Sequence, residues 1–331
     1  MPPRAVVLLS GGLDSILAVR ILQRQEIEVE AINFQTQFSC CGDVSAMAAE
    51  RLGVRLNVIA QDDGYLDVIR KPMFGYGRGA NPCVDCRIFM FQRARRFMEQ
   101  SSAAFVASGE VLGQRPNSQG RRDLQRIEVH SGLEGRLLRP LSAKLLPPTL
   151  AEREGMVQRD MLYDFSGRSR KGLIQLARDF GLPDTDIPSP STGCMLTEKN
   201  FAPRVFDLIT HTKDNAGWDF QLLKVGRQIR CDVQTKVVVG RREHENARIE
   251  YLARHDTART NALLLPANFS GPAVLVVGAV NESTLELAGG LLARFTNYKG
   301  DHPLRVTIEQ GGKQWEREIQ FQPTAQAAGL L

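Results

Sequence analysis

The sequence predicts an α/β protein: a doubly wound parallel sheet in the N-terminal domain and a smaller α+β domain at the C-terminus. Three observations lead to this fold class. The first half of the chain alternates short β-branched runs with amphipathic runs of helical period, a pattern typical of parallel sheets covered on both faces. The second half replaces that alternation with closely spaced strand-like runs. At 331 residues, the chain is also too long for one ordinary hydrophobic core.

The elements of the first domain follow from these runs in order. We expect strands at residues 5–9, 28–33, 55–59 and 104–107, and helices at residues 15–25, 43–52, 86–99 and 169–180. Gly53 and Gly181 stand where helix C-caps are expected. Ligands of open parallel sheets bind beyond the carboxyl ends of the strands. The loops after Leu9, Asn33 and Ala107 are therefore expected to border one site.

A Pro/Ser-rich segment at residues 186–193 is predicted to be extended, because residues before proline avoid the helical region. A short helix at 201–209 then leads to a boundary near 211–217. The predicted domains are thus 1–210 and 218–331. In the second domain, strands are expected at 221–225, 228–232, 236–240, 263–266, 273–277 and 305–309, with helices at 243–254 and 284–296.

The composition argues against a membrane protein and against a disulfide-stabilised secreted protein. The chain is 43% apolar, and no run of eighteen or more apolar residues occurs, which predicts a soluble, cytoplasmic protein without a membrane partner. The net charge of +5 permits a polyanionic partner without requiring one. Six cysteines in a long chain without a signal sequence argue against a disulfide framework and favour metal binding or thiol chemistry.

The turn after the first strand contains the most specific motif, Ser10-Gly11-Gly12-Leu13-Asp14-Ser15. Two glycines allow close backbone approach, and the following helix directs unpaired N–H groups at the turn, so the geometry is that of a phosphate site. The lysine and the spacing of a Walker A motif are missing, as is the third glycine of a dinucleotide motif. A plain turn between a strand and a helix is the alternative.

This motif resembles the SGGxDS loop of the PP-loop family, the N-type ATP pyrophosphatases. In that family the loop binds the pyrophosphate end of ATP while a substrate oxygen attacks the α-phosphate. The resemblance implies ATP and Mg²⁺ as cofactors, phosphate contacts from Ser10, Gly11, Gly12 and Ser15, and Asp14 as a catalytic Mg²⁺ ligand. Asn33, at the end of the second strand, is expected to border the same ATP site.

A set of three cysteines forms the second candidate site. Cys83 and Cys86 have the two-residue gap that lets two sulfurs face one metal or each other, and Cys194 follows over a hundred residues later. A structural zinc normally requires a fourth ligand, whereas three thiolates suit a [4Fe–4S] cluster with one open iron. Buried small hydrophobic side chains are the alternative.

The motifs Asn-Pro-Cys-x-x-Cys and Ser-Thr-Gly-Cys around these residues resemble those of the tRNA 2-thiouridylases. The resemblance implies that Cys86 and Cys194 are the catalytic sulfur-transfer pair. Cysteine at position 83, where the persulfide-dependent enzymes have Asp, resembles the iron–sulfur variant and implies a cluster on Cys83, Cys86 and Cys194. Of the other cysteines, Cys40 and Cys41 are interpreted as packed or incidental thiols, and sulfur relay by one of them is the alternative. Cys231 is interpreted as a packing residue.

The loop after the fourth predicted strand is rich in polar atoms that could hold a ribose, an adenine or a metal. It resembles a segment of the tRNA 4-thiouridine synthetases that helps form the nucleotide site, and a plain polar loop is the alternative. The resemblance implies ATP contacts from Ser108, Gly109, Glu110, Gln114, Ser118 and Gln119. Further along, Arg139 has two interpretations, a phosphate or carboxylate contact and a structural salt bridge.

Basic residues cluster at the start of the second domain, which resembles the RNA-binding NFACT-R domain. Phosphate contacts to RNA are predicted for Lys224, Arg227, Arg230, Lys236, Arg241 and Arg242. A solvated basic sheet edge is the alternative. Few aromatic residues accompany these cations, which favours backbone contact over base readout.

Together the motifs predict an ATP-dependent sulfurtransferase that adenylates a nucleobase carbonyl, most plausibly of a tRNA uridine, and replaces oxygen by sulfur from sulfide or a persulfide carrier. One alternative is a PP-loop enzyme that transfers sulfur or nitrogen to a small molecule. Another is a non-catalytic, nucleotide-regulated RNA-binding protein. The thiolated nucleotide, the sulfur donor and the oligomeric state, with a homodimer as one possibility, are left open.

Overall fold

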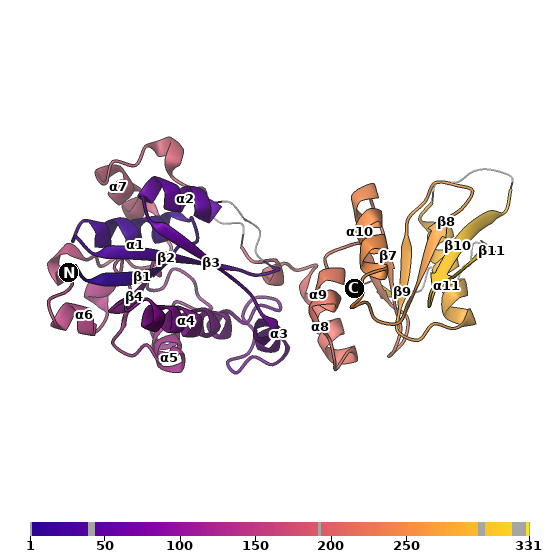
Figure 1. The fold of residues 1–331 in the computed structure, drawn as a ribbon, viewed down its shortest axis with the longest axis horizontal. Helices are drawn as coiled ribbons and strands as arrows, with labels where there is room; N and C mark the ends of the chain where they lie inside the picture. Colours follow the sequence, from indigo (N-terminus) through magenta and orange to yellow (C-terminus); the bar gives the residue numbers. More distant parts are fainter. Residues whose placement is uncertain (1, 39–43, 191–192, 297–301, 320–328, 331) are drawn as a thin grey trace. The chain divides into compact units, whose positions relative to one another are not determined.

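The computed structural model of the chain describes residues 2–38, 44–190, 193–296, 302–319 and 329–330 (Figure 1). Contacts divide the chain into two compact units, Met1–Thr197 and Glu198–Leu331. Each unit has a sheet and a hydrophobic core of its own. Within the described part of the chain, no helix combines the length and apolarity needed to cross a bilayer.

The sheet of the first unit has the order β3-β2-β1-β4-β5, and all its strand pairs are parallel. The strands are β1 (Arg4–Leu8), β2 (Glu28–Gln35), β3 (Arg55–Ala60), β4 (Phe105–Ser108) and β5 (Leu137–Leu138). The expected strands β1 to β4 are confirmed, and β5 is an addition. Parallel strands place their carboxyl ends at one edge, so the loops after β1, β2 and β4 meet there.

Helices cover both faces of this sheet, as a doubly wound fold requires (Figure 1). One face carries α1 (Leu13–Gln23), α2 (Val44–Leu52) and α7 (Lys171–Asp179), and the other carries α4 (Cys83–Gln100) and α5 (Arg121–Ser131). The remaining helical segments of this unit are α3 (Asp63–Arg70), α6 (Leu150–Arg153) and the 3₁₀ turns η1 (Ala143–Leu145), η2 (Arg159–Met161), η3 (Asp184–Asp186) and η4 (Met195–Thr197).

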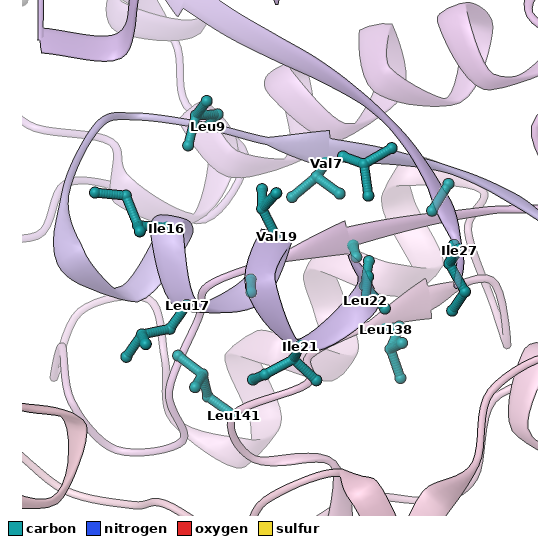
Figure 2. Close-up of a cluster of buried hydrophobic side chains, with 14 of the residues drawn as sticks. Val7, Leu9, Ile16, Leu17, Val19, Ile21, Leu22, Ile27, Leu138 and Leu141 are labelled. Atoms are coloured by element: carbon teal, nitrogen blue, oxygen red, sulfur yellow. The ribbon is translucent and has the colours of Figure 1, made fainter. Parts of the chain in front are cut away.

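The central strand β1 is buried on both faces. Ala5, Val7 and Leu9 pack into the core shared with α1, where Figure 2 shows Val7 and Leu9. Val6 and Leu8 pack into the core shared with α4. This burial explains why the strand reads as an uninterrupted apolar run. The packed strand and α1 together hold the turn that connects them, where the glycine motif lies.

The helix predicted at residues 86–99 begins earlier, at Cys83. Pro82 occupies the N-cap position, and the Cys86 N–H donates to the Pro82 carbonyl at 2.8 Å. Proline is tolerated at a helix start because its missing N–H would have no partner there. Both cysteines therefore lie in the first turn of α4.

The second unit contains an antiparallel sheet of order β11-β10-β8-β9-β7-β6-β12. Its strands are β6 (Arg227–Arg230), β7 (Lys236–Val239), β8 (Asn261–Pro266), β9 (Val274–Val277), β10 (Leu304–Gln310), β11 (Lys313–Ile319) and β12 (Gly329–Leu330). Its helices are α8 (Ala202–His211), α9 (Gly217–Leu222), α10 (Glu243–Ala253) and α11 (Glu282–Arg294). Side chains of α11 pack in one core cluster, and those of α9 and α10 pack in another.

The strand expected at residues 221–225 is wrong, because residues 217–222 form α9. The Asp219 carboxylate accepts from the Ala216 N–H at 2.7 Å and closes the helix start. Trp218 donates from Nε1 to the Leu252 carbonyl at 2.8 Å, which attaches α9 to α10. The apolar run at 222–225 indicated a buried segment, but its length could not distinguish a helix end from a short strand.

The first residues of the second unit form α8, which sequence reasoning treated as the exit from the first domain. Asp207 in α8 accepts two hydrogen bonds from Arg230 of β6, at 2.9 and 2.6 Å. Arg204 donates to the Leu223 carbonyl at 3.0 Å. These contacts join α8 to the antiparallel sheet.

Candidate active site

The glycine turn between β1 and α1 is closed by its own hydrogen bonds. Ser15 Oγ donates to the Gly12 carbonyl at 2.8 Å and accepts from the Ser10 N–H at 3.2 Å. Gly11 has φ +79°, and a Cβ there would lie 2.7 Å from the carbonyl of Val44 at the start of α2. The turn thus requires glycine both for its backbone angle and for its packing. Ser10 and the α1 N-terminus remain at the carboxyl edge of the sheet.

The loop after β4 lies directly against the start of α1. A Cβ on Gly109 would overlap the carbonyl group of Asp14 and would lie 2.6 Å from the Ser15 N atom. Only glycine allows this approach. The structure therefore brings together two motifs that are almost a hundred residues apart in the sequence.

Asp14 is the acidic group at this junction. Gln114 from the β4 loop hydrogen-bonds its side chain, and the guanidinium groups of Arg170 and Arg115 lie within electrostatic range. Burial raises the pKa of Asp14, although Gln114 and the two arginines act in the opposite direction. Sequence reasoning paired Asp14 with Gln114 in one site but missed both arginines, which belong to no recognised motif.

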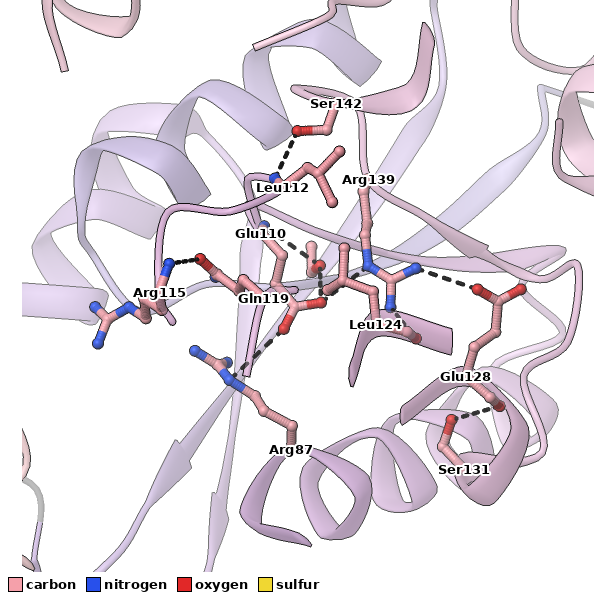
Figure 3. A network of polar contacts seen from close by, with 11 residues as sticks. Arg87, Glu110, Leu112, Arg115, Gln119, Leu124, Glu128, Ser131, Arg139 and Ser142 are labelled. Atoms are coloured by element: carbon pink, nitrogen blue, oxygen red, sulfur yellow. Dashed lines mark hydrogen bonds and ion pairs between the residues drawn. The ribbon is translucent and has the colours of Figure 1, made fainter. Parts of the chain in front are cut away.

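Several side chains predicted to bind ATP form hydrogen bonds and ion pairs within the protein, at the β4 loop and at the end of β1. Glu110 is buried and ion-paired with Arg139 at 3.0 Å, and Ser108 Oγ donates to the same carboxylate at 3.3 Å (Figure 3). Gln119 accepts from the Arg115 N–H at 3.0 Å, and Asn33 donates to the Leu9 carbonyl at 2.8 Å.

Ser118 is also buried, at the end of this loop. These contacts place Ser108, Glu110, Ser118, Gln119 and Asn33 in the framework of the site, and their ATP contacts stay predictions. Gln114 is the side chain of that loop that hydrogen-bonds Asp14. The salt-bridge interpretation of Arg139 is confirmed.

Cys83 and Cys86 lie three residues apart in the first turn of α4, so they share one side of the helix. The Tyr65 hydroxyl lies 3.5 Å from Cys86 Sγ. Burial raises the pKa of Tyr65 well above its ordinary value, and Cys86 and Cys194 both add to the increase. Tyr65 is therefore close to both members of the predicted sulfur-transfer pair.

A backbone contact holds the Cys194 segment near α4. The Ala80 N–H donates to the Leu196 carbonyl at 2.9 Å, and Leu196 is buried. Thr197 donates from its backbone and from Oγ1 to the Cys194 carbonyl, at 2.8 and 2.6 Å. These bonds attach residues 194–197 to the segment that precedes the CxxC pair.

Arg115 connects the cysteines with the glycine turn. Its guanidinium lies within electrostatic range of both Asp14 and Cys83, and Arg87 is a further neighbour. Burial raises the pKa of the Cys83 thiol, while Arg87 and Arg115 lower it. Burial also raises the pKa of Cys86. One cationic side chain is thus within electrostatic range of both the glycine turn and the CxxC pair.

The structure does not show the iron–sulfur cluster that the sequence predicts on Cys83, Cys86 and Cys194, and this cluster stays a prediction. Among the residues that the structure describes, no three His, Cys, Asp or Glu side chains are grouped as metal ligands. Cys40 and Cys41 lie outside the described residues, and Cys231 packs against the second unit's core, where burial raises its pKa to about 11.

The six basic residues predicted to bind RNA differ in accessibility. Lys236 is only 5% exposed, so its predicted contact with RNA is wrong, because a buried ammonium group cannot reach an RNA phosphate in solvent. Arg230 is ion-paired with Asp207, and Arg241 with Glu245. The Arg227 guanidinium carbon lies 4.3 Å from the centroid of the Phe295 ring. Lys224 is half-buried, and Arg242 is exposed at the N-cap of α10.

The first unit is an α/β domain with a five-stranded parallel sheet and helices on both faces. Residues 3–130 match the family model of the tRNA methyl transferase HUP domain, and residues 226–328 match that of the NFACT protein RNA binding domain. The two family models thus match separate parts of the chain, one in each unit.

Curated relatives include the tRNA-specific 2-thiouridylases MnmA of Azorhizobium caulinodans and Xanthobacter autotrophicus. They are 26% and 28% identical over 216 and 217 residues, which is 60% of this chain and 52% of each relative. This chain therefore spans about half the length of these relatives. Among solved structures, a 4-thiouridine synthetase–RNA complex with bound ATP is similar at a TM-score of 0.35 and 20% identity, covering 56% of this chain and 53% of that one.

Proposed function

We propose that this protein is an ATP-dependent sulfurtransferase that adenylates the carbonyl oxygen of a tRNA uridine and replaces it by sulfur. The observation that carries the proposal is that the Arg115 guanidinium lies within electrostatic range of both Asp14 and Cys83. Nucleotide activation and thiol chemistry would then occur in one site. The similarity to tRNA-specific 2-thiouridylases supports the substrate class.

ATP binding is assigned to the glycine turn and its neighbours. Backbone N–H groups at the α1 N-terminus, with Ser10, would hold the pyrophosphate end. Asp14 would hold Mg²⁺ together with the phosphate oxygens, which suits an ion that usually takes one or two carboxylates. Arg115 and Arg170 would offset the phosphate charge, and Gln114 would orient the Asp14 carboxylate.

The first chemical step forms an adenylate. The uridine carbonyl oxygen attacks the α-phosphorus, a P–O bond forms, and the bond to pyrophosphate breaks. Charge that develops on the leaving pyrophosphate is stabilised by the N–H groups of the turn and by the arginines. The carbonyl oxygen then leaves with AMP, which is a far better leaving group than oxide.

The second step transfers sulfur to the base and uses two cysteine thiols. A persulfide on Cys86 or Cys194 attacks the activated carbon through its terminal sulfur, and the C–O bond to AMP breaks. The thiolate of the other cysteine attacks the cysteine sulfur, so the S–S bond breaks, the thiolated base leaves, and a disulfide forms. A persulfide carrier supplies the sulfur, and an external thiol restores the cysteines.

Purified protein, ATP, unmodified tRNA and a persulfide donor test this proposal. We expect pyrophosphate formation and thiolated nucleosides detected by mass spectrometry. Cys86→Ser should abolish thiolation and retain pyrophosphate formation, and Cys231→Ser, a change at the packed thiol, should retain both. Thiolation that persists in both Cys86→Ser and Cys194→Ser would overturn the cysteine mechanism.

The same assay separates the alternatives. Iron analysis after anaerobic purification tests the iron–sulfur variant, since stoichiometric iron that is lost in Cys83→Ser would contradict the thiol mechanism. Pyrophosphate formation that needs a small molecule instead of tRNA would indicate a small substrate. Salt-sensitive tRNA binding without any pyrophosphate formation would indicate a non-catalytic RNA-binding protein.

A further inference from the structure

We propose that the exposed side of α10, in the second unit, is a stacking platform for unpaired bases of RNA. The platform consists of His244, Arg248 and Tyr251, at positions i, i+4 and i+7 on one side of α10, together with His255, which follows the end of the helix and whose ring contacts Tyr251. All four residues are exposed. This inference rests on the proposed function in taking RNA as the ligand, and it adds the surface that would bind it.

The opposite side of α10 holds the helix in place. Ile249 and Leu252 are buried in the core cluster that α9 and α10 share with the sheet. The Leu252 carbonyl accepts from Trp218 Nε1 at 2.8 Å, and Asn246 Oδ1 accepts from the Ala273 N–H at 3.2 Å. The platform is thus carried by a rigid element, which limits the entropy that binding would cost.

Tyr251 is the centre of the platform and is 55% exposed. The Arg248 guanidinium carbon lies 4.8 Å from the centroid of its ring. The His255 ring lies 5.6 Å away at 61°, and His255 Nδ1 is 2.9 Å from Thr257 Oγ1, a contact that orients the imidazole. An exposed aromatic ring between a cation and a second ring is the arrangement on which nucleobases stack.

The charges around Tyr251 suit a polyanion. Among the described residues, no carboxylate lies within ion-pair distance of Arg248, whose Nη2 contacts Gln221 Oε1 at 3.4 Å. Lys224 lies within electrostatic range of Arg248. Glu245 and Glu250 are already paired with arginines that flank the helix. Arg248 can therefore meet a phosphate beside a base stacked on Tyr251.

A flat ring favours a single strand over a duplex, because paired bases are not exposed for stacking. The sequence-based expectation of backbone contact alone followed from the scarcity of aromatic residues near the predicted basic strands. Tyr251 lies outside those strands, and its exposure depends on which side of α10 the core covers. The platform thus adds base contact to the phosphate contacts predicted for this unit.

Fluorescence anisotropy with the full-length protein tests the platform. The probes are a labelled single-stranded oligoribonucleotide and the same strand in a duplex. Tyr251→Ala should weaken single-strand binding by about 5- to 100-fold, and Tyr251→Phe should retain it. Arg248→Gln should weaken binding and reduce the salt dependence by about one charge. Trp315→Ala and Arg305→Gln, matched changes on the exposed side of β11 and β10, should bind as wild type.

The outcomes separate this inference from the proposed function. Loss of single-strand binding in Tyr251→Ala with retention in Tyr251→Phe supports the platform, provided that both variants unfold at the wild-type temperature. Unchanged affinity in Tyr251→Ala overturns the platform alone. An equal loss for single strand and duplex also overturns stacking. If the wild-type protein binds no RNA but still forms pyrophosphate, the tRNA substrate of the proposed function fails as well.

Discussion

The Arg139 guanidinium and the Glu110 carboxylate form a buried ion pair, with 3.0 Å between Nε and Oε2 and side-chain exposures of 2% and 3%. Arg139 also donates to Glu128 of α5 at 3.2 Å and to the Leu124 carbonyl at 3.2 Å. Arg87 of α4 lies 3.7 Å from the other Glu110 oxygen. Glu110 therefore joins the β4 loop to two helices, and this loop carries Gln114 and Arg115 to the site.

Removing Arg139 should destabilise the fold. Arg139→Met leaves the Glu110 charge buried without its main partner, and we expect the free energy of unfolding to fall by about 3–5 kcal/mol in urea titrations. Arg305→Met, at an exposed ion pair with Glu316, should change stability little. An Arg139→Met protein that is as stable as wild type but no longer binds ATP would show that Glu110 and Arg139 serve the ligand instead.

Gly109→Ala should separate the β4 loop from α1. The new Cβ would overlap the Asp14 carbonyl group, which is backbone and cannot rotate away. We expect a lower unfolding temperature and weaker ATP binding, measured by thermal denaturation and calorimetry. Gly217→Ala is the matched control, because no atom lies within 4 Å of the added Cβ and its φ is not positive. Wild-type ATP affinity in Gly109→Ala would contradict a shared nucleotide site.

Asp14→Asn should abolish catalysis without unfolding the protein. Loss of the carboxylate removes the proposed Mg²⁺ ligand, and we expect pyrophosphate formation to drop by about 100-fold or more. Burial raises the pKa of Asp14, so its charge is disfavoured in the folded state, and the amide should not lower stability. Pyrophosphate formation at the wild-type rate in this variant would refute the assigned role.

Lys236 should make the stability of the protein depend on alkaline pH. Burial lowers its pKa from 10.5 to about 8, with Asp207 among its neighbours. Below pH 8 the lysine is charged in both states, and the folded protein bears the full desolvation cost. Between about pH 8 and 10.5 only the unfolded chain holds the proton, so stability rises with pH.

Replacing Lys236 by methionine should remove this pH dependence of the stability. Lys236→Met should be more stable than wild type at pH 7 by roughly 2–4 kcal/mol, and the difference should shrink as the pH approaches 10. Urea unfolding at several pH values measures it. Lys313→Met, at an exposed position of β11, is the control and should leave the pH dependence unchanged. A constant difference between wild type and Lys236→Met would contradict the assigned pKa.

Local patterns in the sequence were sufficient for the architecture of the first unit. The strands β1 to β4, their parallel direction and the loops at their carboxyl ends follow from β-branched runs, helical periods and glycine positions, all of which act over a few residues. The same reasoning failed at residues 221–225 and at the start of α4, where a short apolar run and a proline are compatible with more than one element.

The chain itself determined which residue types were present for chemistry: a glycine turn with Asp14, a CxxC pair, and a loop with Gln114. Only the tertiary packing decided which of the predicted side chains are buried and bonded within the protein. Glu110 and Lys236 are as polar in sequence as Gln114 and Arg242, yet the first two are buried. The physical reason is that burial, ion pairing and the proximity of Arg115 to Asp14 and Cys83 depend on contacts between segments far apart in the chain, which no local pattern encodes.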